Sequence, residues 1–85
     1  MKLEIRYERS FLQDLKALEP AAYQRVRQFV FEEFLQLNQL QDLPGLQQMG
    51  ASAIYYRFTL DNYLVGIEIT GEIVKFVRIL PQPDI

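Results

Sequence analysis

The sequence predicts an α+β domain, a two-layer sandwich of element order β-α-α-β-β-β in which a helical hairpin packs on one face of a mainly antiparallel sheet. Three observations support this. The last third of the chain holds three runs rich in β-branched and aromatic residues, joined by short turn signals. Two amphipathic segments precede these runs, and an alternating apolar–charged segment comes first. The 85 residues are expected to form a single domain, residues 1–85.

The N-terminal strand and the first helix follow from side-chain periodicity. Residues 3–7 alternate apolar and charged side chains, which predicts a half-buried strand. Ser10 followed by Gln13 is a capping-box pattern that predicts the start of a helix. The apolar face of this helix recurs at helical spacing and consists of Phe11, Leu12, Leu15 and Leu18. Pro20 suits the first position of the next helix, where its missing N–H is not needed.

A second helix is predicted over residues 20–41, antiparallel to the first. Its core-facing stripe repeats at three- and four-residue steps and consists of Tyr23, Val26, Val30, Phe34 and Leu37. Phe31 and Leu35 lie roughly 100–140° away from this stripe, given the turn per residue of an α-helix. We expect them on an exposed surface that binds a protein partner, unless the first helix or the N-terminal strand covers them.

The late strands are predicted over residues 53–60, 63–69 and 73–80, after a connector at 46–52 that also allows an earlier strand start. Asp61-Asn62 and Thr70-Gly71-Glu72 are the turn signals between them. Alternation places apolar side chains of the first strand on the helix-covered face: Ile54, Tyr56, Phe58 and Leu60. The opposite face, called the open face below, is expected to carry Arg57, Glu68 and Arg78.

Composition excludes several classes of site. The chain has no cysteine and no histidine, so it lacks a disulfide scaffold, the usual metal ligand and the usual base at neutral pH. No cofactor is expected. The net charge of −2 and a pI of about 5.0 argue against strong nucleic-acid binding through overall charge. No apolar run reaches the ~20 residues that span a bilayer, so a cytoplasmic protein without membrane contact is expected.

Three open-face residues are candidates for catalysis or binding. Arg57 and Arg78 present planar donor forks that match phosphate oxygens, although either could instead pair with Glu68 across the strands. Tyr55 could stack a base or donate a proton, or be an ordinary half-exposed strand aromatic. Gly66 lies inside a strand, which indicates a bulge or a crowded packing site, with close approach of a ligand as the alternative.

Three segments, in order, resemble the small bacterial RelE/ParE toxin superfamily. Residues 11–18 resemble its first-helix signature of Phe, Asp-Leu and Leu. Residues 56–65 resemble its Tyr-Arg-Ile-Arg-Val-Gly-Asp-Tyr-Arg-Ile segment, and residues 76–80 resemble the strand before its His-Arg-x-Asp-Ile-Tyr ending. The resemblance covers nearly the whole chain and implies a toxin that a cognate antitoxin wraps and neutralises. Members cut ribosome-bound mRNA without a metal or poison gyrase.

The resemblance weakens at the residues that the RNases of the family use. Arg57 keeps one basic position, and Arg78 matches a basic position that is not the main catalytic one. Other basic positions of the family are occupied by Thr59, Leu64, Pro81 and Gln82. Because one electrostatic donor is worth roughly 2.7–4 kcal/mol in a transition state, the loss of two arginines predicts weak or absent mRNA cleavage.

Three functions therefore remain open. The first is a toxin of a toxin–antitoxin module that acts on ribosome-bound mRNA through Arg57, Arg78 and Tyr55, with full or weakened activity. The second is a catalytically inactive relative that serves as a protein-binding module, with Phe31 and Leu35 in the contact. The third is a ParE-like gyrase inhibitor. The sequence does not decide between a homodimer and a toxin–antitoxin hetero-oligomer.

Overall fold

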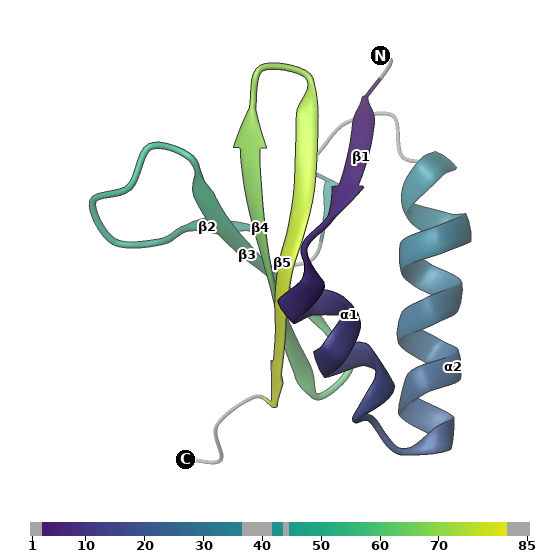
Figure 1. The fold of residues 1–85 in the computed structure, drawn as a ribbon. Coiled ribbons are helices and arrows are strands. Elements are labelled where there is room, and N and C mark those ends of the chain that lie inside the picture. Colours follow the sequence, from purple (N-terminus) through teal and green to yellow (C-terminus); the bar gives the residue numbers. More distant parts are fainter. Residues whose placement is uncertain (1–2, 37–41, 44, 82–85) are drawn as a thin grey trace.

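The computed structural model describes residues 3–36, 42–43 and 45–81, and it confirms the predicted two-layer α+β fold (Figure 1). The helices are α1 (Arg9–Lys16) and α2 (Pro20–Gln28), and α2 continues through a π-helical turn (Phe29–Glu33) and a 3₁₀ turn (Phe34–Gln36). The strands are β1 (Glu4–Tyr7), β2 (Gln47–Gln48), β3 (Tyr55–Leu60), β4 (Tyr63–Thr70) and β5 (Ile73–Pro81). The predicted helical residues 37–41 lie outside the described residues.

The described strands form one sheet in the order β1-β5-β4-β3-β2. All neighbours except one pair are antiparallel, which confirms the predicted mainly antiparallel sheet; the exception is β1, which runs parallel to β5. The sequence allowed the connector at residues 46–52 to begin the first late strand early. The connector instead contains a separate short strand, β2, which pairs with β3. Both predicted hairpin turns are present, and their first residues, Asp61 and Gly71, have φ values of 54° and 60°. Positive φ at this position is what the favoured two-residue hairpin turns require.

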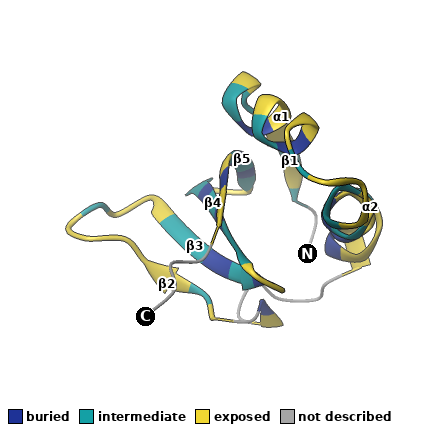
Figure 2. Ribbon diagram, turned by 90° about the horizontal axis from the view of Figure 1, so that it is seen from below, coloured by how far each residue is buried: buried dark blue, intermediate teal, exposed yellow. Residues whose placement is uncertain are grey.

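The core lies between the helices and the sheet, where the buried segments of β3, β4, β5 and the helices face one another (Figure 2). Phe76 of β5 is at its centre and is fully buried. Its ring lies 5.1–6.5 Å, centroid to centroid, from the rings of Tyr7, Phe11, Phe34 and Phe58. Val26, Val30 and Phe34 of the predicted helix stripe are buried, and Phe29, which was not predicted, is buried beside Phe58.

The predicted capping box at Ser10 is wrong. The residue before α1 is Glu8, and no side chain caps this helix end. The Ser10 hydroxyl instead donates a hydrogen bond of 2.6 Å to the backbone carbonyl of Val77 in β5. β1 pairs with β5 only as far as Phe76, so the outer edge of β5 beyond that point needs other partners. α1 lies along this edge and supplies them.

A β-bulge in β5 overturns the strict alternation expected for that strand. Gly66 pairs with Arg78, but the next β4 residue, Ile67, pairs with Phe76, so Val77 is the extra residue. A bulge puts two consecutive side chains on nearly the same side of the strand. Phe76 and Ile79 therefore both reach the core, while Arg78 stays exposed. The bulge is the reason that Arg78 lies on the open face as predicted, despite the burial of Phe76.

Candidate functional site

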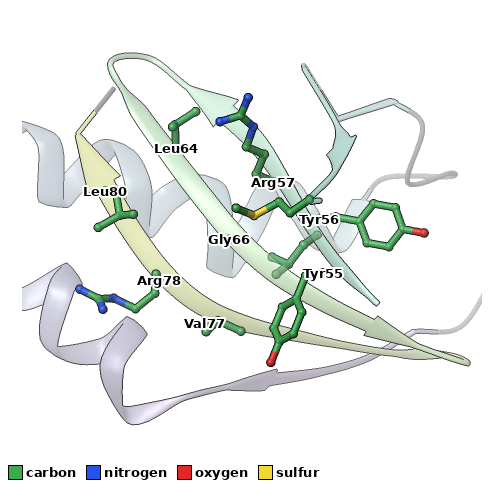
Figure 3. A pocket seen from close by; sticks show the side chains of 10 residues that line it. Tyr55, Tyr56, Arg57, Leu64, Gly66, Val77, Arg78 and Leu80 are labelled. Carbon is green, nitrogen blue, oxygen red and sulfur yellow. The ribbon is translucent and has the colours of Figure 1, made fainter. Parts of the chain in front are cut away.

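The open face of the sheet carries a shallow hollow of about 310 Å³ across β3, β4 and β5 (Figure 3). Arg57, Gly66 and Arg78 are direct cross-strand neighbours, so the two arginines flank a glycine. Two strand spacings of roughly 4.8 Å put their backbones about 10 Å apart. The lining is mainly apolar and includes Met49, Leu64, Val77 and Leu80. The arrangement combines two cationic groups with an apolar floor.

Steric crowding does not require a glycine at position 66. A Cβ built at this position would meet only the Cβ of Arg78, at 4.0 Å, which is ordinary contact. The register shift next to Gly66 agrees with the predicted bulge. Because glycine has no side chain, the backbone between the two arginines is open to close approach by another molecule.

Arg57 and Arg78 do not pair with Glu68, so that alternative from the sequence is wrong. Glu68 instead lies 3.9 Å from the ammonium group of Lys75. Arg57 donates a hydrogen bond of 3.2 Å to the side-chain oxygen of Gln47 on β2. The Arg57 guanidinium is therefore hydrogen-bonded to an uncharged side chain, and no carboxylate within the described residues forms an ion pair with Arg57.

Arg78 is held by Asp14 of α1. Its Nε donates to Asp14 Oδ2 at 2.7 Å and its Nη2 donates to Oδ1 at 3.3 Å. Asp14 Oδ2 also accepts the backbone N–H of Ile79 at 2.9 Å. Burial acts to raise the pKa of Asp14, but the hydrogen bonds from Arg78 and Ile79, together with the charge of Arg78, outweigh it and lower that pKa. The same contact raises the pKa of Arg78.

The Asp14 carboxylate is expected to stabilise the fold at neutral pH and to lose this contribution in acid. Its folded-state pKa is depressed, so the contribution is present above the unfolded value of about 3.9 and disappears as the pH falls through the folded value. Melting temperatures of the wild-type chain and of Asp14→Asn should therefore differ at neutral pH and converge in acid. Asp61→Asn, on an exposed turn, controls for the loss of one charge. A difference that is independent of pH would contradict this assignment.

Tyr55 lies on the same face as both arginines and lines the same hollow. Its side chain is 42% exposed, and its cross-strand neighbour on β4 is Glu68. Figure 3 shows Tyr55 beside Val77, and Tyr55 lies two residues along β3 from Arg57. All three predicted site residues are thus brought to one surface, where stacking by a phenol ring and phosphate binding by a guanidinium are both chemically available.

Phe31 and Leu35 lie on the helical layer, away from this hollow. The Phe31 ring packs 4.9 Å from the ring of Tyr7, so the N-terminal strand partly covers it. Leu35 is 61% exposed. A second hollow of about 290 Å³ lies between α1 and α2 and is lined by Leu12, Leu15, Lys16, Tyr23, Arg27 and Phe31. We call it the hairpin groove.

The sequence did not reveal Asp14 as part of the site, nor Met49, Leu64 and Leu80 as its floor. Asp14 and Arg78 are 64 residues apart, and local spacing carries no signal for such a pair. The cross-strand neighbours Leu64 and Leu80 could have been found from strand alternation once the bulge in β5 was known.

Among the described residues, no group of His, Cys, Asp or Glu side chains is placed to hold a metal ion. No helix in the described part of the chain is long and apolar enough to span a membrane.

Comparisons with known proteins agree with the predicted resemblance. The chain is 29% identical over 84 residues to the toxin RelE3 of Methanocaldococcus jannaschii, a match that covers 98% of this chain and 94% of that protein. Its fold matches the toxin–antitoxin complex RelB–RelE from Methanococcus jannaschii with a TM-score of 0.73 and 28% identity, over 89% of this chain and 88% of that one.

The fold likeness extends to a more distant structure. The archaeal RelE–RelB complex from Pyrococcus horikoshii OT3 matches with a TM-score of 0.75 over all of both chains, at 16% identity. No family model matches the chain. The predicted resemblance to the RelE/ParE superfamily is confirmed by the curated relative and the shared fold.

Proposed function

We propose that this RelE-like chain is the toxin component of a toxin–antitoxin module, acts in the cytoplasm and is neutralised by a cognate antitoxin protein. The observation that carries the proposal is the similarity to toxin RelE3 over 98% of the chain, together with a fold that matches a chain of a RelB–RelE complex. The open face adds chemistry that suits this role, since Tyr55, Arg57 and Arg78 all border one hollow.

Cleavage of ribosome-bound mRNA is proposed to be slow. Only Arg57 offers the hollow a guanidinium without a described carboxylate partner, because Arg78 is paired with Asp14. Leu64 lines the hollow at a position where the resembled RNases carry an arginine. Little positive charge is therefore available to stabilise a developing phosphorane.

A catalytically inactive protein-binding module is the second candidate. It is favoured by the apolar exposure on both faces of the domain. Leu80 and Met49 are each 46% exposed on the open face, and Leu35 is 61% exposed on the helical layer. A cleavage assay on translating ribosomes separates the two candidates, because the module would leave mRNA intact at any concentration. ParE-like gyrase inhibition stays an alternative with the same fold.

The hairpin groove is proposed as an antitoxin contact, with Phe31 in its wall and the exposed Leu35 four residues beyond Phe31 in the helical segment that continues α2. Lys16 and Arg27 line the groove, and no ion pair with either is present in the part of the chain that the structure describes. An amphipathic segment with acidic residues beside its apolar side would complement such a surface.

The double variant Leu12→Ser, Leu35→Ser is expected to weaken binding of the antitoxin by about tenfold or more, because each leucine loses apolar area buried in the complex. The probe is the protein product of the adjacent reading frame, titrated by calorimetry. Both leucines are exposed, at 39% and 61%, so the free domain should keep its melting temperature. Phe31 is left intact because it packs on Tyr7.

Ile54→Ser is the matched control. Ile54 was expected in a strand on the helix-covered face, but it directly precedes β3, is 36% exposed and does not line the hairpin groove. Its affinity for the antitoxin should equal that of the wild-type chain. Unchanged affinity in the Leu12→Ser, Leu35→Ser variant would remove the hairpin groove from the interface.

A further inference from the structure

A carboxylate already occupies one edge of the Arg78 donor fork. Asp14 accepts from Nε and Nη2 of Arg78 at 2.7 and 3.3 Å, which is the two-point geometry by which a guanidinium binds a carboxylate or a phosphate. The Arg78 side chain is 51% exposed, whereas Asp14 is only 19% exposed. An incoming anion can reach Arg78, but it meets a guanidinium whose charge and best-aligned donors are engaged.

The position of Asp14 is fixed by more than this ion pair. α1 takes over the outer edge of β5 where β1 ends, through the Glu8 amide on the Phe76 carbonyl and the Ser10 hydroxyl on the Val77 carbonyl. Asp14 completes the series by accepting the Ile79 amide at 2.9 Å. Its carboxylate is therefore anchored to the backbone of β5 just beyond the bulge, and an exposed ion pair held by long side chains alone would lack this anchor.

The consequence is visible in the directions of the two arginines (Figure 3). Arg78 reaches from β5 toward α1 and away from Arg57, although their backbones flank the same glycine. Among the described residues, Arg57 has a hydrogen bond to the neutral side chain of Gln47 and no ion pair with a carboxylate. The hollow thus holds two guanidinium groups on either side of Gly66. That of Arg78 is engaged by a carboxylate, and that of Arg57 is available to a ligand.

We propose that Asp14 masks Arg78, so that a phosphodiester bound on the open face contacts Arg57 but gains Arg78 only by displacing the Asp14 carboxylate. The contact is autoinhibitory, and the ligand class is a single-stranded nucleic acid, recognised by its phosphates. This inference rests on the proposed function, because it takes the open face as the surface that meets RNA.

The test is binding of a short fluorescent oligouridine RNA to the purified chain, measured by anisotropy over a series of KCl concentrations. Asp14→Asn is expected to tighten binding about tenfold, the value of one additional charge-assisted hydrogen bond. The plot of log affinity against log salt should become steeper by about 0.7, the increment for one more phosphate contact on a single strand. The asparagine keeps a side-chain carbonyl that can accept the Ile79 amide.

Two further variants distinguish masking from general effects. Asp61→Asn removes the same charge from the β3–β4 turn, where Asp61 lies 3.4 Å from Arg25, and should leave the salt slope unchanged. Adding Arg78→Gln to Asp14→Asn should abolish the gain in affinity.

The proposal is overturned if Asp14→Asn binds like the wild-type chain, if its gain survives Arg78→Gln, or if no variant binds RNA. Failure of masking alone is recognised when Arg57→Ala still weakens RNA binding. Failure of the proposed toxin role would appear instead as a loss of antitoxin binding by the wild-type chain, which this assay does not measure.

Discussion

The triple variant Leu64→Arg, Pro81→His, Gln82→Arg is expected to cleave ribosome-bound mRNA about 10²-fold faster than the wild-type chain, since one electrostatic donor at a transition state is worth at least that much. These three positions are where the resembled RNases carry basic residues. Leu64 lines the open-face hollow, two residues along β4 from Gly66, which pairs with Arg57, and its β5 neighbour is Leu80. A guanidinium there would add positive charge near Arg57, whose described hydrogen-bond partner is the neutral side chain of Gln47.

The measurement is the rate at which a reporter mRNA on translating ribosomes is cut, with mapping of the cut sites. Leu35→Arg adds a positive charge on the helical layer, where Leu35 is 61% exposed, and should leave the rate unchanged. If the triple variant gained nothing, missing basic groups would not be the reason for slow cleavage. The gyrase or binding-module alternatives would then be preferred.

Phe76→Ala is expected to destabilise the domain by about 3–5 kcal/mol, the usual cost of truncating a buried phenylalanine. Phe76 is fully buried and its ring packs against four other aromatic rings. A domain of this size has a total unfolding free energy of only about 5–15 kcal/mol, so the variant should be largely unfolded at a modest urea concentration.

Urea denaturation followed by circular dichroism measures this effect. Leu80→Ala on the same strand is the control, because Leu80 is 46% exposed and its truncation should shift the midpoint little. A Phe76→Ala midpoint equal to that of the control would mean that the aromatic cluster does not form the centre of the core.

The elements of the fold were predictable because their signals are local. Alternation and turn residues gave three late strands, of which two keep their predicted starts at Tyr63 and Ile73. The pairing of β1 with β5 was not predictable, because it joins the two ends of the chain and leaves no periodic trace in either. The edge contacts of α1 were missed for the same reason, and the Ser10 hydroxyl was wrongly assigned to its own helix.

The sheet face on which the candidate residues lie was predictable, and the ionic partners of these residues were not. Tyr55, Arg57 and Arg78 were correctly expected on the open face, yet strict alternation would have put Arg78 beside the buried Phe76. Only the extra residue at Val77 resolves this conflict, and single-residue bulges have no reliable sequence signal apart from the nearby Gly66. The partner of Arg78 comes from α1, so its engaged state depends entirely on tertiary structure.

The toxin role is tested most directly by the growth of a bacterial host that expresses the chain alone or together with the product of its adjacent reading frame. The chain alone should slow growth, and the adjacent product should restore it. Restoration should be weaker for the Leu12→Ser, Leu35→Ser chain at equal expression. Growth that is unaffected by the chain, or slowed growth that the adjacent product fails to relieve, would contradict the assignment as a neutralised toxin.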